Sequence, residues 1–150
     1  MSDLATPSYL LGPAECEAFL DAFEGSLPAT EWTHQAHIAA ATVYLNRYGD
    51  SVLSHTRAAI RNYLLARGRP SGAYHETLTI FWLALVAEAI QQQGSVSLHD
   101  AVYRNCIAFG AQSKLHELYY GFDVFKSPEA HARWIPPDLR PLAIPFPTDF

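Results

Sequence analysis

The sequence has few of the features that mark secreted or disulfide-stabilised proteins. Its two cysteines, Cys16 and Cys106, are far apart and fit neither a disulfide framework nor a cysteine-based zinc site. The N-terminus has no basic segment followed by an apolar one, so it does not resemble a secretory signal. We therefore expect a cytoplasmic protein whose thiols stay reduced and inert.

Charge is also scarce. Only 17% of the residues are charged, and 10 Lys and Arg face 15 Asp and Glu. A mildly acidic chain of this kind has no electrostatic footprint for nucleic acid or an anionic membrane. The longest apolar stretch, residues 78–90, is shorter than the ~18 apolar residues that a membrane-spanning helix needs. We expect this stretch to form the most buried helix of a globular protein instead.

The chain also lacks alternating apolar and polar residues over any length typical of a strand. Its 150 residues, of which 49% are hydrophobic, are enough for one domain with a substantial core. Helix caps and breakers predict an all-α, single-domain bundle of five or six helices. The helices are expected at about residues 13–24, 31–48, 51–67, 74–93, 98–109 and 128–134, with a further turn or two within residues 113–120.

The two ends of the chain are expected to differ from the bundle. Residues 1–12 are predicted to form a flexible arm. Residues 135–150 contain prolines at 136, 137, 141, 145 and 147, which exclude regular structure. We expect an extended tail packed on the body, because Leu139, Leu142, Ile144 and Phe146 need cover.

Two histidines in residues 31–48 form the first candidate site. His34 and His37 are three positions apart, so on a helix they project from one face and can bind one metal ion. Ala41 and Tyr44 continue that face, which indicates that both imidazoles point inward. The alternative is one exposed histidine and one histidine hydrogen-bonded in the core.

A second polar pair, His75 and Glu76, lies at the start of the helix expected at residues 74–93. Two inward histidines from one helix and His75 from another give the ligand count of an open catalytic metal site. Glu76 is then a fourth ligand or a general base that orients a metal-bound water. The alternative for Glu76 is an acid that stabilises the first turn of its own helix.

The remaining histidines have weaker signals. His116 and Glu117 supply another ligand if residues 114–120 fold back over the bundle. His55, His99 and His131 sit among polar neighbours, and we expect all three to be solvated.

Aromatic and hydroxyl side chains flank both motifs. We expect Trp32, Tyr74, Thr79 and Trp82 to line a substrate pocket. The alternative for the tryptophans is packing in the core, which is favoured because tryptophan side chains are usually largely buried. The hydroxyls of Thr77 and Thr79 are also expected to form hydrogen bonds within their own helix.

Three segments resemble a family of small uncharacterised bacterial proteins. They are Trp-Thr-His-x-x-His-Ile at residues 32–38, Tyr-His-Glu-Thr-Leu-Thr at residues 74–79, and Ser-Pro-Glu-Ala-x-x-x-Trp-x-x-Pro-Asp-Leu-x-Pro-Leu at residues 127–142. The resemblance covers most of the chain and implies no particular reaction. It implies that one set of residues belongs together: Trp32, His34, His37, Tyr74, His75, Glu76 and Thr77.

These motifs predict a metal-dependent enzyme that acts on a small molecule by hydrolysis or lyase chemistry. His34, His37 and His75 are the expected ligands of a divalent transition metal, and His75 and Glu76 are the expected catalytic residues. Imidazole and carboxylate ligands suit zinc, iron, manganese and nickel alike.

Two alternatives stay open. One is a metal-free enzyme in which His75 and Glu76 do acid–base work. The other is a non-enzymatic helical module that binds a small ligand or a protein. The expected partner is a small molecule rather than nucleic acid or a membrane, and a homodimer is left open.

Overall fold

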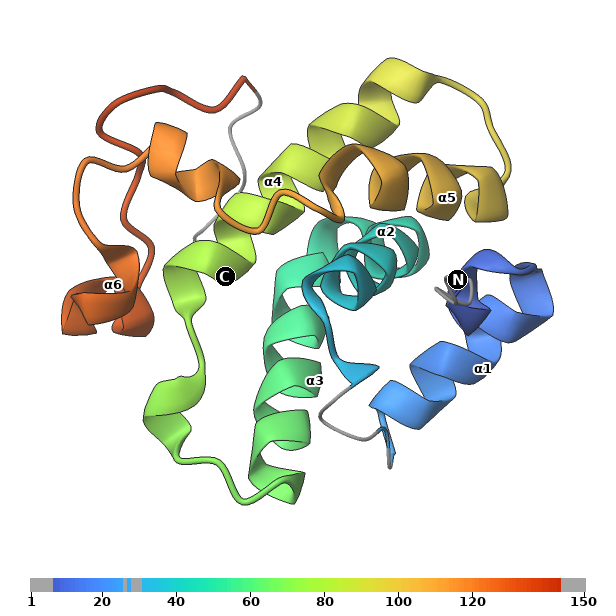
Figure 1. Cartoon of the computed structure of the whole chain (residues 1–150), viewed down its shortest axis with the longest axis horizontal. Coiled ribbons are helices and arrows are strands. Elements are labelled where there is room, and N and C mark those ends of the chain that lie inside the picture. The colour runs from blue at the N-terminus through green and yellow to red at the C-terminus, as the bar shows by residue number, and fades with distance from the viewer. Residues whose placement is uncertain (1–6, 26, 28–30, 144–150) are drawn as a thin grey trace, which may run out of the picture.

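Helices are the only regular secondary structure in the residues that a computed structural model describes, which are 7–25, 27 and 31–143. The prediction of an all-α protein is confirmed for this part of the chain. The α-helices are α1 (Pro13–Phe23), α2 (His34–Tyr48), α3 (Val52–Ala66), α4 (Glu76–Gln93), α5 (Leu98–Phe109) and the short α6 (Pro128–Ala132) (Figure 1). Short 3-10 turns are η1 (Ser8–Leu10), η3 (Gly49–Ser51), η4 (Ser71–Ala73), η5 (Leu115–Leu118) and η6 (Val124–Lys126).

Two helices begin later than the sequence predicts, because a different side chain caps each. The Thr33 side chain accepts a hydrogen bond from the backbone N–H of Ala36, so α2 begins at His34. His75 caps α4 through Nδ1, which places the start of that helix at Glu76. Both cap residues belong to motifs that the sequence suggested for a functional site.

The helix at the centre of the fold is α2 rather than α4. It packs against α3, α4 and α5 (Figure 1). Its buried alanines, Ala36, Ala39, Ala40 and Ala41, have side chains small enough to let neighbouring helices approach closely. The hydrophobicity of the sequence predicted α4 as the most buried helix. Hydrophobicity alone does not indicate how closely helices can pack through small residues such as alanine.

Helix α4 is apolar on all sides because it lies between two hydrophobic cores. One face, with Ile80 and Leu83, belongs to the main core around α2. The opposite face, with Phe81 and Leu85, belongs to a second core that Tyr120 and other residues of the C-terminal segment complete. A helix between two cores needs apolar residues on both faces.

The C-terminal segment is attached to α4 by a buried threonine. The Thr77 hydroxyl donates to the carbonyl of Arg133 at 2.7 Å and accepts from the N–H of Ile135 at 3.1 Å. Thr77 therefore bonds across the fold, and the predicted bond within its own helix is wrong. In the tail, Leu142 is partly buried against the second core, whereas Leu139 is 61% exposed.

The ends of the chain can be compared with prediction only in part. Tyr9 and Leu10, placed by the sequence in a flexible arm, are buried residues of η1. Residues 1–6 and 144–150, including Ile144 and Phe146, lie outside the described residues. Within the described part of the chain, no helix has both the length and the apolar character needed to cross a membrane.

Replacing Thr77 with valine tests the attachment of the C-terminal segment. Thr77→Val removes two hydrogen bonds and leaves two partly buried backbone groups unpaired, so we expect the free energy of unfolding to fall by about 2 kcal/mol. Hydrogen exchange should become faster in residues 128–135. Thr77→Ser keeps the hydroxyl and should leave exchange there close to wild type. Equal exchange in wild type and Thr77→Val would show that these bonds do not hold the segment.

Candidate functional site

A cavity of about 370 Å³ lies between α2, α3 and the first half of α4. The residues that the sequence assigned to a metal site and a substrate pocket line it together, with one exception. They are Trp32, His34, His37, Tyr74, His75, Thr79 and Trp82. The exception is Glu76, which is not part of the cavity wall.

The rest of the wall is mainly apolar. Phe23, Tyr44, Ile60 and Leu64 contribute side chains from α1, α2 and α3, and Phe125 contributes one from η6. Among the described residues that line the cavity there is no Asp, Glu, Lys or Arg. A charged ligand would lose its hydration here without gaining a charged partner, so the wall favours an uncharged one.

His37 is held in one protonation state and one orientation. Its Nδ1 lies 2.7 Å from the Thr33 carbonyl oxygen, which can only accept, so Nδ1 carries the proton and donates it. Burial lowers the pKa of His37 to about 4, although the hydrogen bond to Thr33 partly opposes this effect. The ring is therefore neutral at pH 7, and its Nε2 is an unprotonated acceptor.

His34 reaches a similar state through a different partner. Its Nε2 donates to the Phe109 carbonyl at 3.1 Å, which leaves Nδ1 unprotonated in the neutral ring. Burial lowers the pKa of His34 as well, and the bond to Phe109 again opposes the shift. The two histidines thus bring two neutral imidazole acceptors to one cavity.

Both ring nitrogens of His75 already form hydrogen bonds within the protein. Its Nε2 donates to the Val124 carbonyl at 2.9 Å, and its Nδ1 accepts from the Leu78 N–H at 3.1 Å. Burial lowers the pKa of His75, so the neutral ring that both bonds require is the stable form at pH 7. A metal or a proton could reach His75 only after one of these bonds is broken.

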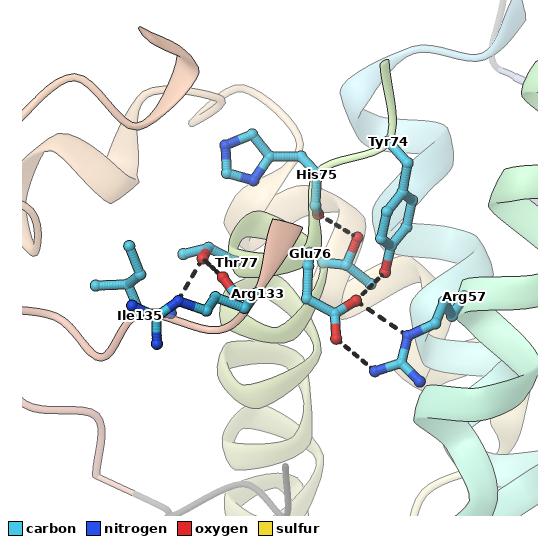
Figure 2. Close-up of polar contacts among 8 residues, drawn as sticks. Arg57, Tyr74, His75, Glu76, Thr77, Arg133 and Ile135 are labelled. Atoms are coloured by element: carbon cyan, nitrogen blue, oxygen red, sulfur yellow. Dashed lines mark hydrogen bonds and ion pairs between the residues drawn. The ribbon is translucent and has the colours of Figure 1, made fainter. Parts of the chain in front are cut away.

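Glu76 is not among the residues that line the cavity, and its carboxylate points toward Arg57 on α3 (Figure 2). Its carboxylate accepts from Arg57 Nε at 3.0 Å and from the Tyr74 hydroxyl at 2.6 Å, and it forms a second bond with the Arg57 guanidinium. Burial raises the pKa of Glu76, but the hydrogen bonds from Arg57 and Tyr74 and the positive charge outweigh burial and lower it. These contacts join α3 to α4 and position the ring of Tyr74.

The second His-Glu pair diverges in the structure. His116 is buried, and its Nδ1 has no hydrogen-bond partner in the described part of the chain, whereas Glu117 is exposed. His131 is half-buried rather than fully solvated as predicted, and its ring lies 4.2 Å from that of His75. Its two nitrogens face the carbonyl oxygens of Tyr74 and Phe125 at 3.1 and 3.0 Å.

The predicted metal ligands come to one cavity but not to one point. Within residues 7–25, 27 and 31–143, no three His, Cys, Asp or Glu side chains are placed to hold one metal ion. For His34, His37 and His75 the physical reason is that each ring is turned by a hydrogen bond to a backbone carbonyl. The metal site stays a prediction.

Sequence reasoning missed two residues of α3 that matter here. Thr56 lines the cavity, and Arg57 holds Glu76. A signal for Thr56 was present, because it lies four residues after Val52 and four before Ile60 and so shares their inward face. Arg57 had no such signal, since its partner comes from another helix.

Replacing Glu76 with glutamine tests its structural role. Because the pKa of Glu76 is lowered by folding, its charge stabilises the protein above the usual value of 4.5, and this contribution is lost as the pH falls through the folded value. Glu76→Gln should lower the free energy of unfolding by about 2 kcal/mol at neutral pH, because Arg57 loses its counter-charge in a partly buried site. In urea unfolding, the difference from wild type should shrink as the pH falls below 4.5.

A matched control is available on the same helix. Glu88 has no ion pair among the described residues, so Glu88→Gln should change stability by less than about 0.5 kcal/mol. The ion-pair role of Glu76 would be contradicted if the two substitutions lowered the free energy of unfolding equally. It would also be contradicted if the stability difference between Glu76→Gln and wild type became larger at acid pH.

Comparison with protein-family models, curated proteins and solved structures finds no significant match. The cavity and its contacts are therefore the basis on which a function for this chain rests.

Proposed function

We propose that this chain binds an uncharged, mainly apolar small molecule in the cavity between α2, α3 and α4. The observation that carries the proposal is the composition of the wall: aromatic and aliphatic side chains, neutral imidazoles and no charged group among the described residues. A volume of about 370 Å³ is within the range of small-molecule sites, which are typically apolar with a few directed polar groups.

The aromatic residues favour a ring-shaped ligand. Trp32 and Trp82 are 50 residues apart in the sequence yet line the same cavity, together with Tyr74. An aromatic pair contributes roughly 0.5–1.5 kcal/mol beyond the area it buries, so several rings around one ligand add useful affinity. The small side chains of Ala40 and Ala41 leave room beside these rings.

The state of the polar groups favours binding over acid–base catalysis. A general base works best when its pKa lies near the operating pH, and the pKa of His37 is about 4. His75 and Glu76, the expected catalytic pair, already have their polar atoms in hydrogen bonds to the protein. His37 is thus a good acceptor for a ligand's proton donor and a weak base.

Filling the cavity tests the proposal. We expect 2-naphthol, an uncharged bicyclic probe, to bind the wild-type protein in isothermal titration calorimetry. Ala41→Leu places a larger side chain in the cavity wall and should lower the affinity at least about 10-fold, since steric exclusion costs more than 1.4 kcal/mol. Ala58→Leu, on the exposed surface of α3, is the control and should bind like wild type.

A charged relative of the probe gives the opposite outcome. The anion 2-naphthoate has the same ring system and should bind at least about 10-fold more weakly, because its carboxylate would be desolvated without a partner. The proposal fails if 2-naphthoate binds as well as 2-naphthol, or if Ala41→Leu leaves binding unchanged.

A metal-dependent hydrolase or lyase is the second candidate. The observation that favours it is that His34 and His37 each keep one unprotonated nitrogen on the wall of one cavity. These two atoms suit zinc, iron, manganese or nickel, with further ligands from water or substrate. His75 would join them only by giving up its bond to Val124 or Leu78.

Elemental analysis of the untagged protein tests this second candidate. It predicts about one equivalent of a transition metal, which His37→Ala removes and His55→Ala, an exposed histidine outside this cavity, retains. Less than about a tenth of an equivalent in the wild type would contradict it.

A further inference from the structure

A second pocket lies between the end of α1 and helices α2 and α3. Its volume is about 280 Å³, and it shares two lining residues, Phe23 and Tyr44, with the main cavity. The other lining residues are Glu24, Gly25, Tyr48, His55, Ala59, Asn62, Tyr63 and Ala66. Small-molecule sites typically measure ~300–1,000 Å³, so this pocket suits a ligand at the lower end of that range.

The pocket is negatively charged. Among the described residues that line it, Glu24 is the one acid and there is no Lys or Arg. Glu24 also forms no ion pair within the described part of the chain. Arg47 lies close enough for its charge to act on Tyr44, but it is paired with Glu17 at 2.7 Å. With His55 neutral, the lining thus carries one net negative charge.

A buried tyrosine holds this carboxylate at the pocket wall. Tyr44 is 2% exposed, and its hydroxyl donates to Oε2 of Glu24. Burial raises the pKa of Tyr44, and the bond to Glu24 raises it further, so the hydroxyl keeps its proton and remains the donor. Glu24 itself is exposed, and its Oε1 can still accept a hydrogen bond from a ligand.

Aromatic rings continue from the carboxylate along the pocket. The ring of Tyr44 lies 5.4 Å from that of Tyr48, and Tyr48 stacks on His55 at 3.7 Å with 6° between the ring planes. Tyr48 and Ala59 are half-buried and His55 is exposed, so these side chains keep accessible surface beside the charged group. The pocket therefore combines a negative charge with an apolar wall.

The remaining polar groups favour a ligand that donates hydrogen bonds. Nδ1 of His55 lies 3.0 Å from the Ser51 carbonyl, so the neutral ring keeps Nε2 as an acceptor. The hydroxyl of Tyr63 already donates to the Leu27 carbonyl at 3.1 Å. An ammonium group has only donors and carries the charge that complements a carboxylate.

We propose that this pocket is a second binding site, for a small organic ammonium ion whose charge lies beside Glu24 and whose apolar part contacts Tyr48 and Ala59. The aromatic rings favour the same ligand, because the face of a ring attracts a cation. The inference does not rest on the function proposed for the main cavity, where the ligand is uncharged.

Two probes of nearly the same shape isolate the role of the charge. At pH 8, 2-phenylethylamine is an ammonium ion, whereas 2-phenylethanol is neutral. NMR titrations that follow the backbone amide of Gly25 and the side-chain amide of Asn62 report on this pocket, since both residues line it. The ammonium ion should bind at least about fivefold more tightly than the alcohol, which is the upper range for an ion pair at an accessible carboxylate.

Two substitutions of equal charge assign this preference to one carboxylate. Glu24→Gln removes the charge and keeps an oxygen that can accept from Tyr44. It should lower the affinity for the ammonium ion at least about fivefold and leave that for the alcohol within about twofold. Asp21→Asn is the matched control, because Asp21 is an exposed acid one turn earlier on α1 that does not line the pocket. Its ammonium affinity should stay within about twofold of wild type.

A pair of filling substitutions separates the two cavities. Ala59 lines the second pocket and not the main cavity, and Ala41 lines the main cavity and not the second pocket. Ala59→Leu should therefore weaken ammonium binding at least about fivefold, and Ala41→Leu should leave it within about twofold. Glu24→Gln lies at an exposed site and provides the test even if Ala59→Leu does not fold.

Three results would overturn the inference. The first is equal affinity for the ammonium ion and the alcohol at Gly25 and Asn62. The second is a Glu24→Gln protein that binds the ammonium ion like wild type. The third is an equal loss in Asp21→Asn and Glu24→Gln, which would show that the general surface charge attracts the cation. None of these results bears on the binding of 2-naphthol in the main cavity.

Discussion

The fold and the cavity both depend on the way residues 74–77 direct their side chains to opposite sides of the loop that enters α4 (Figure 2). Tyr74 and Glu76 turn toward Arg57 on α3. His75 and Thr77 turn the other way and bind carbonyl groups of η6 and of Arg133. Four consecutive residues thus join α3, α4 and the C-terminal segment, and each joint is a buried or partly buried polar contact that is costly to break.

This arrangement explains why a motif that looks catalytic is structural in large part. A histidine next to a glutamate at a buried helix start is a reasonable candidate for acid–base chemistry. In the folded chain the glutamate neutralises an arginine and the histidine caps a helix while holding a distant carbonyl. The polar atoms that remain available to a ligand are elsewhere in the same cavity: Nε2 of His37 and Nδ1 of His34. Both imidazoles are neutral at pH 7, and this is the basis of the proposed preference for an uncharged ligand.

The sequence could predict the helices, most of their ends and the residues that face inward, because caps and apolar periodicity are local properties. The motifs also predicted that Trp32, His34 and His37 lie in one region with Tyr74, His75 and Trp82. It could not predict the partner of each inward polar atom. His34 bonds to Phe109 and His75 to Val124, which are 75 and 49 residues away. Contacts over such distances depend on how α2, α5 and η6 pack, and that is a property of the whole fold. The partner of Arg57 and the lack of a partner for the Thr56 hydroxyl in the described part of the chain also depend on this packing, so the sequence could not predict them.

The claim on which the rest depends is that His37 is a neutral imidazole with an unprotonated Nε2 in the cavity. Nitrogen NMR of the histidine side chains measures this directly. The account predicts the Nδ1–H form of His37 at neutral pH and no protonation until the pH approaches about 4. A His37 ring that carries its proton on Nε2, or that protonates near its usual pKa of 6.5, would contradict the account.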